Sequence, residues 1–178
     1  MNARSDNAAP SRETRDRSTG AVLAITSDDD RFRATRVEAV RIAAGDGSRL
    51  ILYDWDAATV LGDPLPSNWS AEGTDADTPS ELDERALEAA GRAAIAAQVR
   101  DARHAGVKAS AWLPSEPGPD AMVRWAREHG AGTIVVPDDL DERGKLETLV
   151  NGTSDPAEAV ADESPVRVVV VPKRESDR

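Results

Sequence analysis

Two acidic loops contain the residues of this sequence that could do chemistry. Residues 28–30, all aspartate, follow an apolar run at 20–26, and residues 138–142, DDLDE, follow a second run at 133–137. Closely spaced carboxylates are ligands that a hard cation such as Mg²⁺ prefers. A run such as 28–30 more often caps the next helix and is solvated, and a metal site is the alternative interpretation.

The second acidic loop leads to Gly152, Thr153 and Ser154, a stretch whose composition suits phosphate binding. Glycine lets the backbone approach a phosphate, and free amides at a helix start donate hydrogen bonds to it. Three residues predict such a helix start just beyond: Asp155, Pro156 and Glu158. The carboxylates at 138–142 oppose a triphosphate, because like charges about 4 Å apart repel by about 4 kcal/mol near a protein surface.

Other catalytic chemistry finds little support in the sequence. The chain has no cysteine, which excludes thiol catalysis and zinc–thiolate sites. His104 and His129 are predicted near helix ends, where an imidazole complements the helix dipole, and no second histidine is spaced to join either. We therefore expect a protein that is not an enzyme and has no metal centre.

Alternating strands and helices must position these loops. Strands are predicted from five apolar runs: 20–26, 49–55, 107–113, 133–137 and 166–171. Helices are predicted between them: 31–45, 80–106, a third between 115 and 131, and a short one from Asp155 to Pro165. On the first helix, residues at helical spacing predict the buried face: Phe32, Val37, Val40 and Ala44. Right-handed crossovers then give a parallel sheet with helices on both faces.

In such a sheet, ligands bind beyond the carboxyl ends of the strands, at the point where the strand order reverses. If the first strand is central, that point lies between the first and fourth strands. The two acidic loops would then lie together.

One domain is predicted at 20–172 of the 178 residues, with polar tails at 1–19 and 173–178. Residues 57–79, rich in Pro, Gly and Asp, are predicted as a long variable loop, with a functional lid as the alternative. The formal net charge of -11 disfavours nucleic-acid and membrane partners. The chain has no apolar run of membrane-spanning length and no signal peptide at its start, so we expect an acidic, cytoplasmic protein.

Four tryptophans make up most of the aromatic residues. Trp112 and Trp125 are predicted to lie in the core. Trp55, at the end of the second strand, could stack on an adenine-like ring, and Trp69 could fold over a site from the long loop.

The order of these elements resembles that of the universal stress protein family over residues 20–172. Four stretches carry the resemblance: VLAITSDD, RLILYDWD, EPGPDAMVRWAREHGAGTIVVP and NGTSDPAEAVADESPVRVVVVP. The family implies an adenine nucleotide α-hydrolase-like fold, a three-layer α/β/α domain whose five-stranded parallel sheet has the order 3-2-1-4-5. It also implies a homodimer through the strand at 166–171, an apolar edge that would invite pairing.

The resemblance further implies an adenine nucleotide site that is degenerate here. Some members bind ATP through G-x-x-G-x9-G-[S/T] after the fourth strand and through an aspartate after the first. Gly152 and Thr153 match, but the earlier glycines fall on Asp139 and Glu142, and the aspartate falls on Ser27. The candidate cofactor-binding residues are Ser27, Asp28, Asp54, Gly152, Thr153 and Ser154. We expect weak or lost binding of ATP or AMP.

The sequence thus predicts a universal-stress-protein-like binding and regulatory module of the stress response. Two alternatives stay open. One is a nucleotide- or Mg-dependent hydrolase of the same fold, although the loop TSDDD has no glycine for a phosphate. The other is a protein-interaction domain without a ligand.

Overall fold

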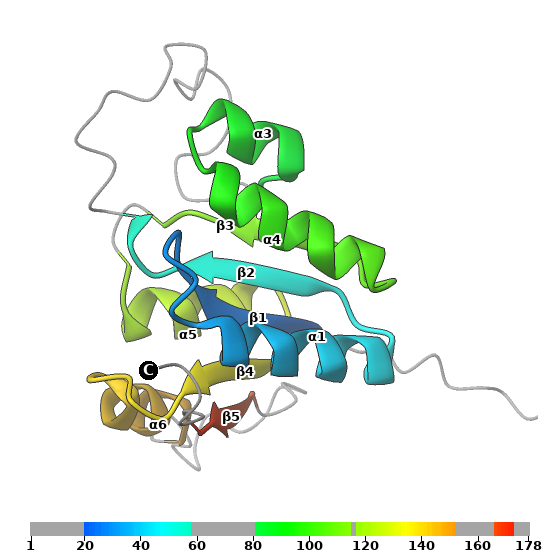
Figure 1. Ribbon diagram of the computed structural model, residues 1–178. Helices are drawn as coiled ribbons and strands as arrows, with labels where there is room; N and C mark the ends of the chain where they lie inside the picture. Colours follow the sequence, from blue (N-terminus) through cyan, green and yellow to red (C-terminus); the bar gives the residue numbers. More distant parts are fainter. Residues whose placement is uncertain (1–19, 58–80, 115–116, 152–165, 173–178) are drawn as a thin grey trace, which may run out of the picture.

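The computed structural model describes residues 20–57, 81–114, 117–151 and 166–172. Five parallel strands form one sheet in the order β3-β2-β1-β4-β5. The strands are β1 Ala21–Thr26, β2 Leu50–Asp54, β3 Ala109–Trp112, β4 Ala131–Pro137 and β5 Arg167–Val171. The predicted strand order is confirmed, and it reverses between β1 and β4 (Figure 1).

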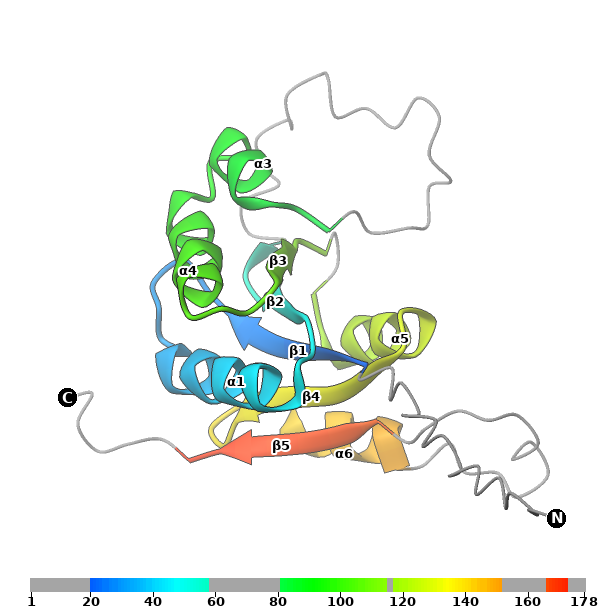
Figure 2. The same cartoon turned by 90° about the vertical axis from the view of Figure 1, so that its right-hand side faces the viewer.

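Helices cover both faces of this sheet. They are α1 Arg33–Asp46, α3 Glu84–Ala89, α4 Ala93–His104, α5 Pro119–Glu128 and α6 Arg143–Asn151. Helices α1 and α4 lie on one face, whereas α5 and α6 lie on the other (Figure 2). The three-layer α/β/α architecture is therefore confirmed. None of these helices is long and apolar enough to cross a membrane.

Two hydrophobic cores separate the layers because successive strand residues face opposite sides. Val22 and Ala24 pack toward α1 and α4, and Leu23 and Ile25 pack toward α5. All residues of β1 and β2 are buried, as their unbroken apolar runs predict for covered parallel strands. Trp112 and Trp125 are buried in the second core, which confirms their prediction.

The predicted buried face of α1 is wrong in part. Val37 is 58% exposed and Ala44 is also exposed, although Phe32 is buried and Val40 packs at the edge of the core. The helix buries another set instead: Thr35, Arg36, Ala39, Ile42 and Ala43. Small side chains let the helix lie close to the sheet, and the buried Arg36 is neutralised by an ion pair with Asp30.

The single helix predicted at 80–106 is two helices. Gly91 has φ +75°, a left-handed conformation that glycine adopts easily, and it separates α3 from α4. Asp83 caps α3 by accepting a hydrogen bond from the Ala86 amide at 2.9 Å. The break turns the next residue, Arg92, into the interior, where it is 2% exposed.

The acidic stretch after β4 is not all loop, because α6 begins at Arg143. Leu146 is buried, and Leu149 and Val150 pack against the same core, which matches the helical spacing i, i+3, i+4. The helix predicted from Asp155 lies outside the described residues, as does Trp69.

Candidate functional site

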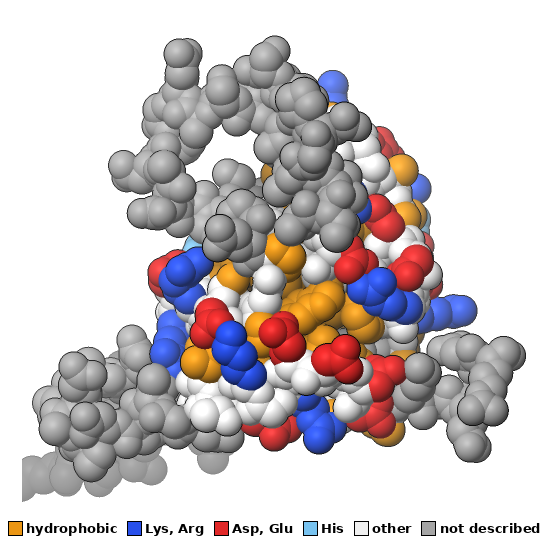
Figure 3. Space-filling view, turned by 90° about the vertical axis from the view of Figure 1, so that its left-hand side faces the viewer, with side chains coloured by type: hydrophobic (Ala, Val, Ile, Leu, Met, Phe, Trp, Pro, Cys, Tyr) orange, Lys and Arg blue, Asp and Glu red, His pale blue; other side chains and the backbone are white. Residues whose placement is uncertain are grey.

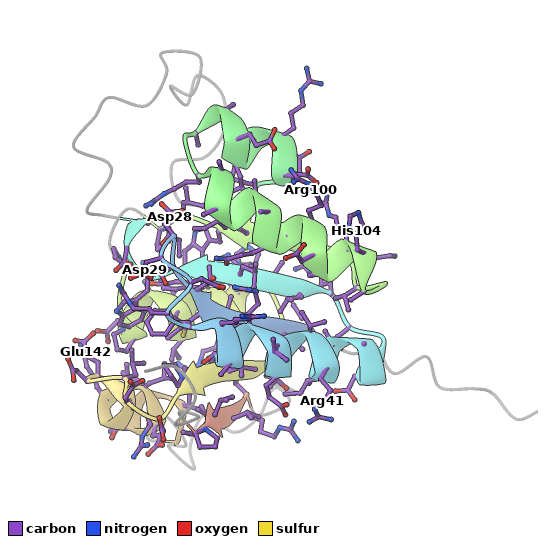
Figure 4. The ribbon with its side chains drawn as sticks, in the orientation of Figure 1. Asp28, Asp29, Arg41, Arg100, His104 and Glu142 are labelled. Carbon is purple, nitrogen blue, oxygen red and sulfur yellow. The ribbon has the colours of Figure 1, made fainter. Side chains whose placement is uncertain are left out.

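The candidate site lies where the carboxyl ends of the strands meet. Asp28 and Asp29, from the loop after β1, and Glu142, from the loop after β4, all lie at this end of the sheet (Figure 4). The predicted meeting of the two acidic loops is therefore confirmed. Apolar surface is exposed at the centre of this end, between acidic and basic side chains (Figure 3).

Each aspartate of the loop at 28–30 is bound by a different arginine. The pairs are Asp28 with Arg92, Asp29 with Arg31 at 3.3 Å, and Asp30 with Arg36. Among the described residues, no group of three or more acidic, histidine or cysteine side chains could hold a metal ion. The side chains of Asp28, Asp29 and Asp30 are 41%, 60% and 41% exposed, so the loop is solvated and is also one side of an ion-pair network.

Arg92 is the centre of this network. Its side chain is 3% exposed, and it pairs with the carboxylates of both Asp28 and Asp54. The Nη2 atom also lies 3.4 Å from the backbone oxygen of Asp56, to which it donates. A buried charge must be paired, so one guanidinium from the start of α4 joins the loops that follow β1 and β2.

Asp54 is fully buried at the end of β2. Its Oδ1 accepts a hydrogen bond from the Asp56 amide at 3.0 Å. Its Oδ2 lies 2.9 Å from Arg92 Nη2, but it accepts no well-aligned hydrogen bond from the described residues. Burial raises the pKa of this carboxyl to about 6, and the positive charge of Arg92 opposes that shift.

Ser27 is buried beside this pair, and its hydroxyl is already used. The hydroxyl donates to Asp29 Oδ1 at 2.6 Å and thereby lowers the pKa of Asp29. The backbone oxygen of Ser27 accepts from Gln98 Nε2 at 2.9 Å, and the other end of that amide contacts the Thr26 hydroxyl. Helix α4 therefore holds the loop after β1 through two side chains, Arg92 and Gln98.

The loop after β4 is different, because its carboxylates are exposed. Residues 138, 139, 141 and 142 are all acidic and exposed. The basic residues that follow have partners of their own. Arg143 donates to the Asp138 backbone oxygen at 3.1 Å, and Lys145 pairs with Asp120 on α5 at 2.5 Å.

The structure brings together three of the predicted site residues, Ser27, Asp28 and Asp54. Gly152, Thr153 and Ser154 lie outside the described residues. Sequence reasoning missed Arg92 and Gln98, although an arginine directly after a glycine in an alanine-rich helix was a signal that the helix breaks there. Trp55 lies at this end, half-buried, with its ring centroid 5.9 Å from that of Tyr53, and its stacking on a ligand stays a prediction.

No protein-family model matches the sequence, and no curated protein matches it. Among solved structures, the chain is similar to a universal stress protein from Archaeoglobus fulgidus in complex with dAMP, with 15% identity, a TM-score of 0.49, and 86% of this chain and 97% of that chain covered. A second structure of universal stress protein from that organism has 15% identity and a TM-score of 0.47, with 86% of this chain and 98% of that chain covered. A universal stress protein in complex with cAMP has 24% identity and a TM-score of 0.40, covering 85% and 96%.

Proposed function

We propose that this chain is a universal-stress-protein-like binding and regulatory module whose nucleotide position has weak or lost affinity for ATP. The observation that carries this proposal is the occupation of Arg92 by Asp28 and Asp54. A phosphate at this end of the sheet would compete with two carboxylates for the buried guanidinium. Arg33, exposed in the first turn of α1, has no ion-pair partner among the described residues and is one cation left for a ligand.

The exposed carboxylates at 138–142 strengthen this expectation. They repel ATP more than AMP, because repulsion grows with the number of phosphate charges. If an adenine nucleotide binds, AMP and cyclic AMP should therefore bind at least as well as ATP. The Ser27 hydroxyl is buried and bonded to Asp29, so the module would bind without turnover.

Thermal unfolding with ATP, ADP, AMP and cyclic AMP, each with and without Mg²⁺, tests this function. At about 1 mM ligand we expect a rise in Tm of about 1 °C or less for ATP, which corresponds to millimolar affinity. A rise of about 10 °C with ATP and Mg²⁺ would indicate micromolar affinity and overturn the proposal.

We also propose a homodimer through β5. The two outer strands of the sheet differ: Leu82 forms a two-hydrogen-bond bridge with Ala111 on β3, whereas β5 pairs only with β4 among the described residues. Val170 on β5 is 36% exposed. An uncovered apolar edge favours pairing with a second copy.

Light scattering after size exclusion measures this assembly. The wild type should run as a dimer and Val170→Lys as a monomer. Val37→Lys makes the same chemical change on α1, outside the strand edge, and should leave the dimer intact. A monomeric wild type would contradict the dimer while leaving the nucleotide proposal untouched.

A further inference from the structure

A second candidate site lies at the opposite end of the sheet, where α4 turns into β3. A hollow of about 400 Å³ is lined there by Arg103, Gly106, Val107, Lys108 and Ala109. His104, at the end of α4 beside this turn, lies far from Asp28 and Asp29 at the other end of the molecule (Figure 4). The hollow is therefore separate from the candidate site described above.

Arg103 is held in place by its neighbour in the lining. Its Nε donates to the Ala109 backbone oxygen at 2.9 Å. No carboxylate of the described residues lies within ion-pair distance of Arg103, so both terminal nitrogens of the guanidinium stay available. A guanidinium fixed through Nε presents these two nitrogens as a preorganised fork for an anion.

The outer edge of β3 adds a backbone donor to the same hollow. Lys108 accepts from the Leu50 amide and so faces β2, whereas the Ala109 oxygen faces outward to Arg103. The N–H and C=O of one strand residue point to the same side, so the Ala109 amide also faces outward. Two residues further along, the outward amide and oxygen of Ala111 form the bridge to Leu82. Among the described residues, no such backbone partner covers the Ala109 amide.

The charges of the lining are positive. Lys108 is exposed and has no carboxylate partner among the described residues. The carbonyls at the end of α4 are already occupied, since Ala102 accepts from the Val107 amide and Arg103 from the Gly106 amide. The chain has a formal net charge of -11, but the charged residues of this lining are Arg103 and Lys108, which have no carboxylate partner among the described residues.

We propose that this hollow is a binding site for a small molecule with a phosphoryl group, held by the Arg103 guanidinium and the Ala109 amide, with Lys108 adding positive charge to the lining. A guanidinium fork and an ammonium together match the two negative charges of a phosphate monoester. The site does not depend on the proposed function, because no residue of the nucleotide position takes part in it.

Titration of the ¹⁵N-labelled full chain with inorganic phosphate and with phenyl phosphate tests the site. Sodium chloride at matched ionic strength and benzoate serve as controls for charge and for the ring. We expect saturable amide shifts at Gly106, Val107, Lys108 and Ala109 with both phosphates, and none at these positions with the controls. Tighter binding of phenyl phosphate would identify an organic monoester, and equal binding would identify free phosphate.

Variants separate a built site from general surface charge. Arg103→Gln and Lys108→Gln should each weaken phosphate binding by about tenfold, as expected for the loss of one charged hydrogen-bond donor. Arg103→Lys keeps the charge but loses the fork, and it should bind nearly as poorly as Arg103→Gln. Arg85→Gln removes an exposed arginine of α3 that has no ion-pair partner among the described residues, and it should bind like the wild type.

Two results would overturn the proposal. One is amide shifts that never saturate or that spread over the whole surface, and the other is equal losses for Arg103→Gln and Arg85→Gln. AMP carries a monoester too, so its shifts distinguish the two proposals. Shifts at 106–109 report the hollow, and shifts at 27–31 and 54–56 report the nucleotide position.

Discussion

The two halves of the candidate nucleotide position would oppose phosphate binding for different physical reasons. In the half formed by the loops after β1 and β2, a buried arginine is present but Asp28 and Asp54 already bind it. In the half formed by the loop after β4, the carboxylates at 138–142 are exposed and simply have the wrong sign. A site can therefore lack a positive charge for a ligand either because its cation is paired within the protein or because the residues around it are acidic. The pairing of Arg92 also stabilises the fold, so removing it lowers stability. The carboxylates at 138–142 are exposed, and a few substitutions can replace them.

The largest expected effect follows from removing Arg92. Arg92→Ala would leave Asp54 buried without its cation, and removing one partner of a buried pair typically costs about 3–5 kcal/mol. Urea unfolding measures the loss. Arg100→Ala, which breaks exposed pairs between α4 and the residues Glu84 and Glu88 of α3, should stay close to the wild type. Equal stability of the two variants would show that the buried pairs of Arg92 contribute no more to stability than exposed pairs do.

A pH-dependent effect of up to about 3 kcal/mol is expected at Asp54, because a pKa of about 6 is roughly two units above that of an unfolded aspartate. The folded form takes up the proton more readily, so this group costs stability as the pH rises from about 4 to 6. Asp54→Asn does not ionise, so it does not lose this stability as the pH rises. Its free energy of unfolding relative to the wild type should therefore increase between pH 4 and pH 7, as measured by urea unfolding at each pH. A constant difference would contradict this prediction.

A smaller gain is expected in the half after β4. Asp139→Gly with Glu142→Gly removes two charges and places glycine at the positions where the family pattern has it. ATP affinity should rise by about thirtyfold, measured by calorimetry, because each of the two removed repulsions is worth about 1 kcal/mol. Asp139→Asn with Glu142→Gln removes the charges alone. If both double variants bind ATP equally well, charge rather than backbone freedom set the affinity.

The smallest effect is expected at Arg31, which pairs with Asp29 and Asp56 at the surface. Arg31→Gln should cost about 0.5 kcal/mol at low salt, and the loss should shrink in 1 M salt because exposed pairs are screened. The Arg92→Ala loss should persist in the same salt. A salt-independent Arg31 effect would show that the outer pair is as enclosed as the inner one.

The sequence was enough for the fold because four strands are apolar runs, the third alternates apolar and polar residues, and helices are predicted between the strands. It was enough to place the two acidic loops together, since parallel strands share one carboxyl end. It was not enough to find Arg92, which lies 64 residues from Asp28 in the chain and inside a run that predicts one continuous helix. The buried face of α1 could not be predicted for the same reason. Apolar spacing favoured Val37 as a buried residue, whereas the ion pair with Asp30 allows Arg36 to be buried instead.

The bridge between Leu82 and Ala111 has a consequence for assembly size. It covers the outer edge of β3 at Ala111, whereas no described residue covers the outer edge of β5. If two copies pair through β5 around a two-fold axis, as we propose, each β5 edge is covered by the other copy. The bridge at Ala111 shortens the stretch of β3 edge on which a further copy could pair, and so disfavours growth into a fibre.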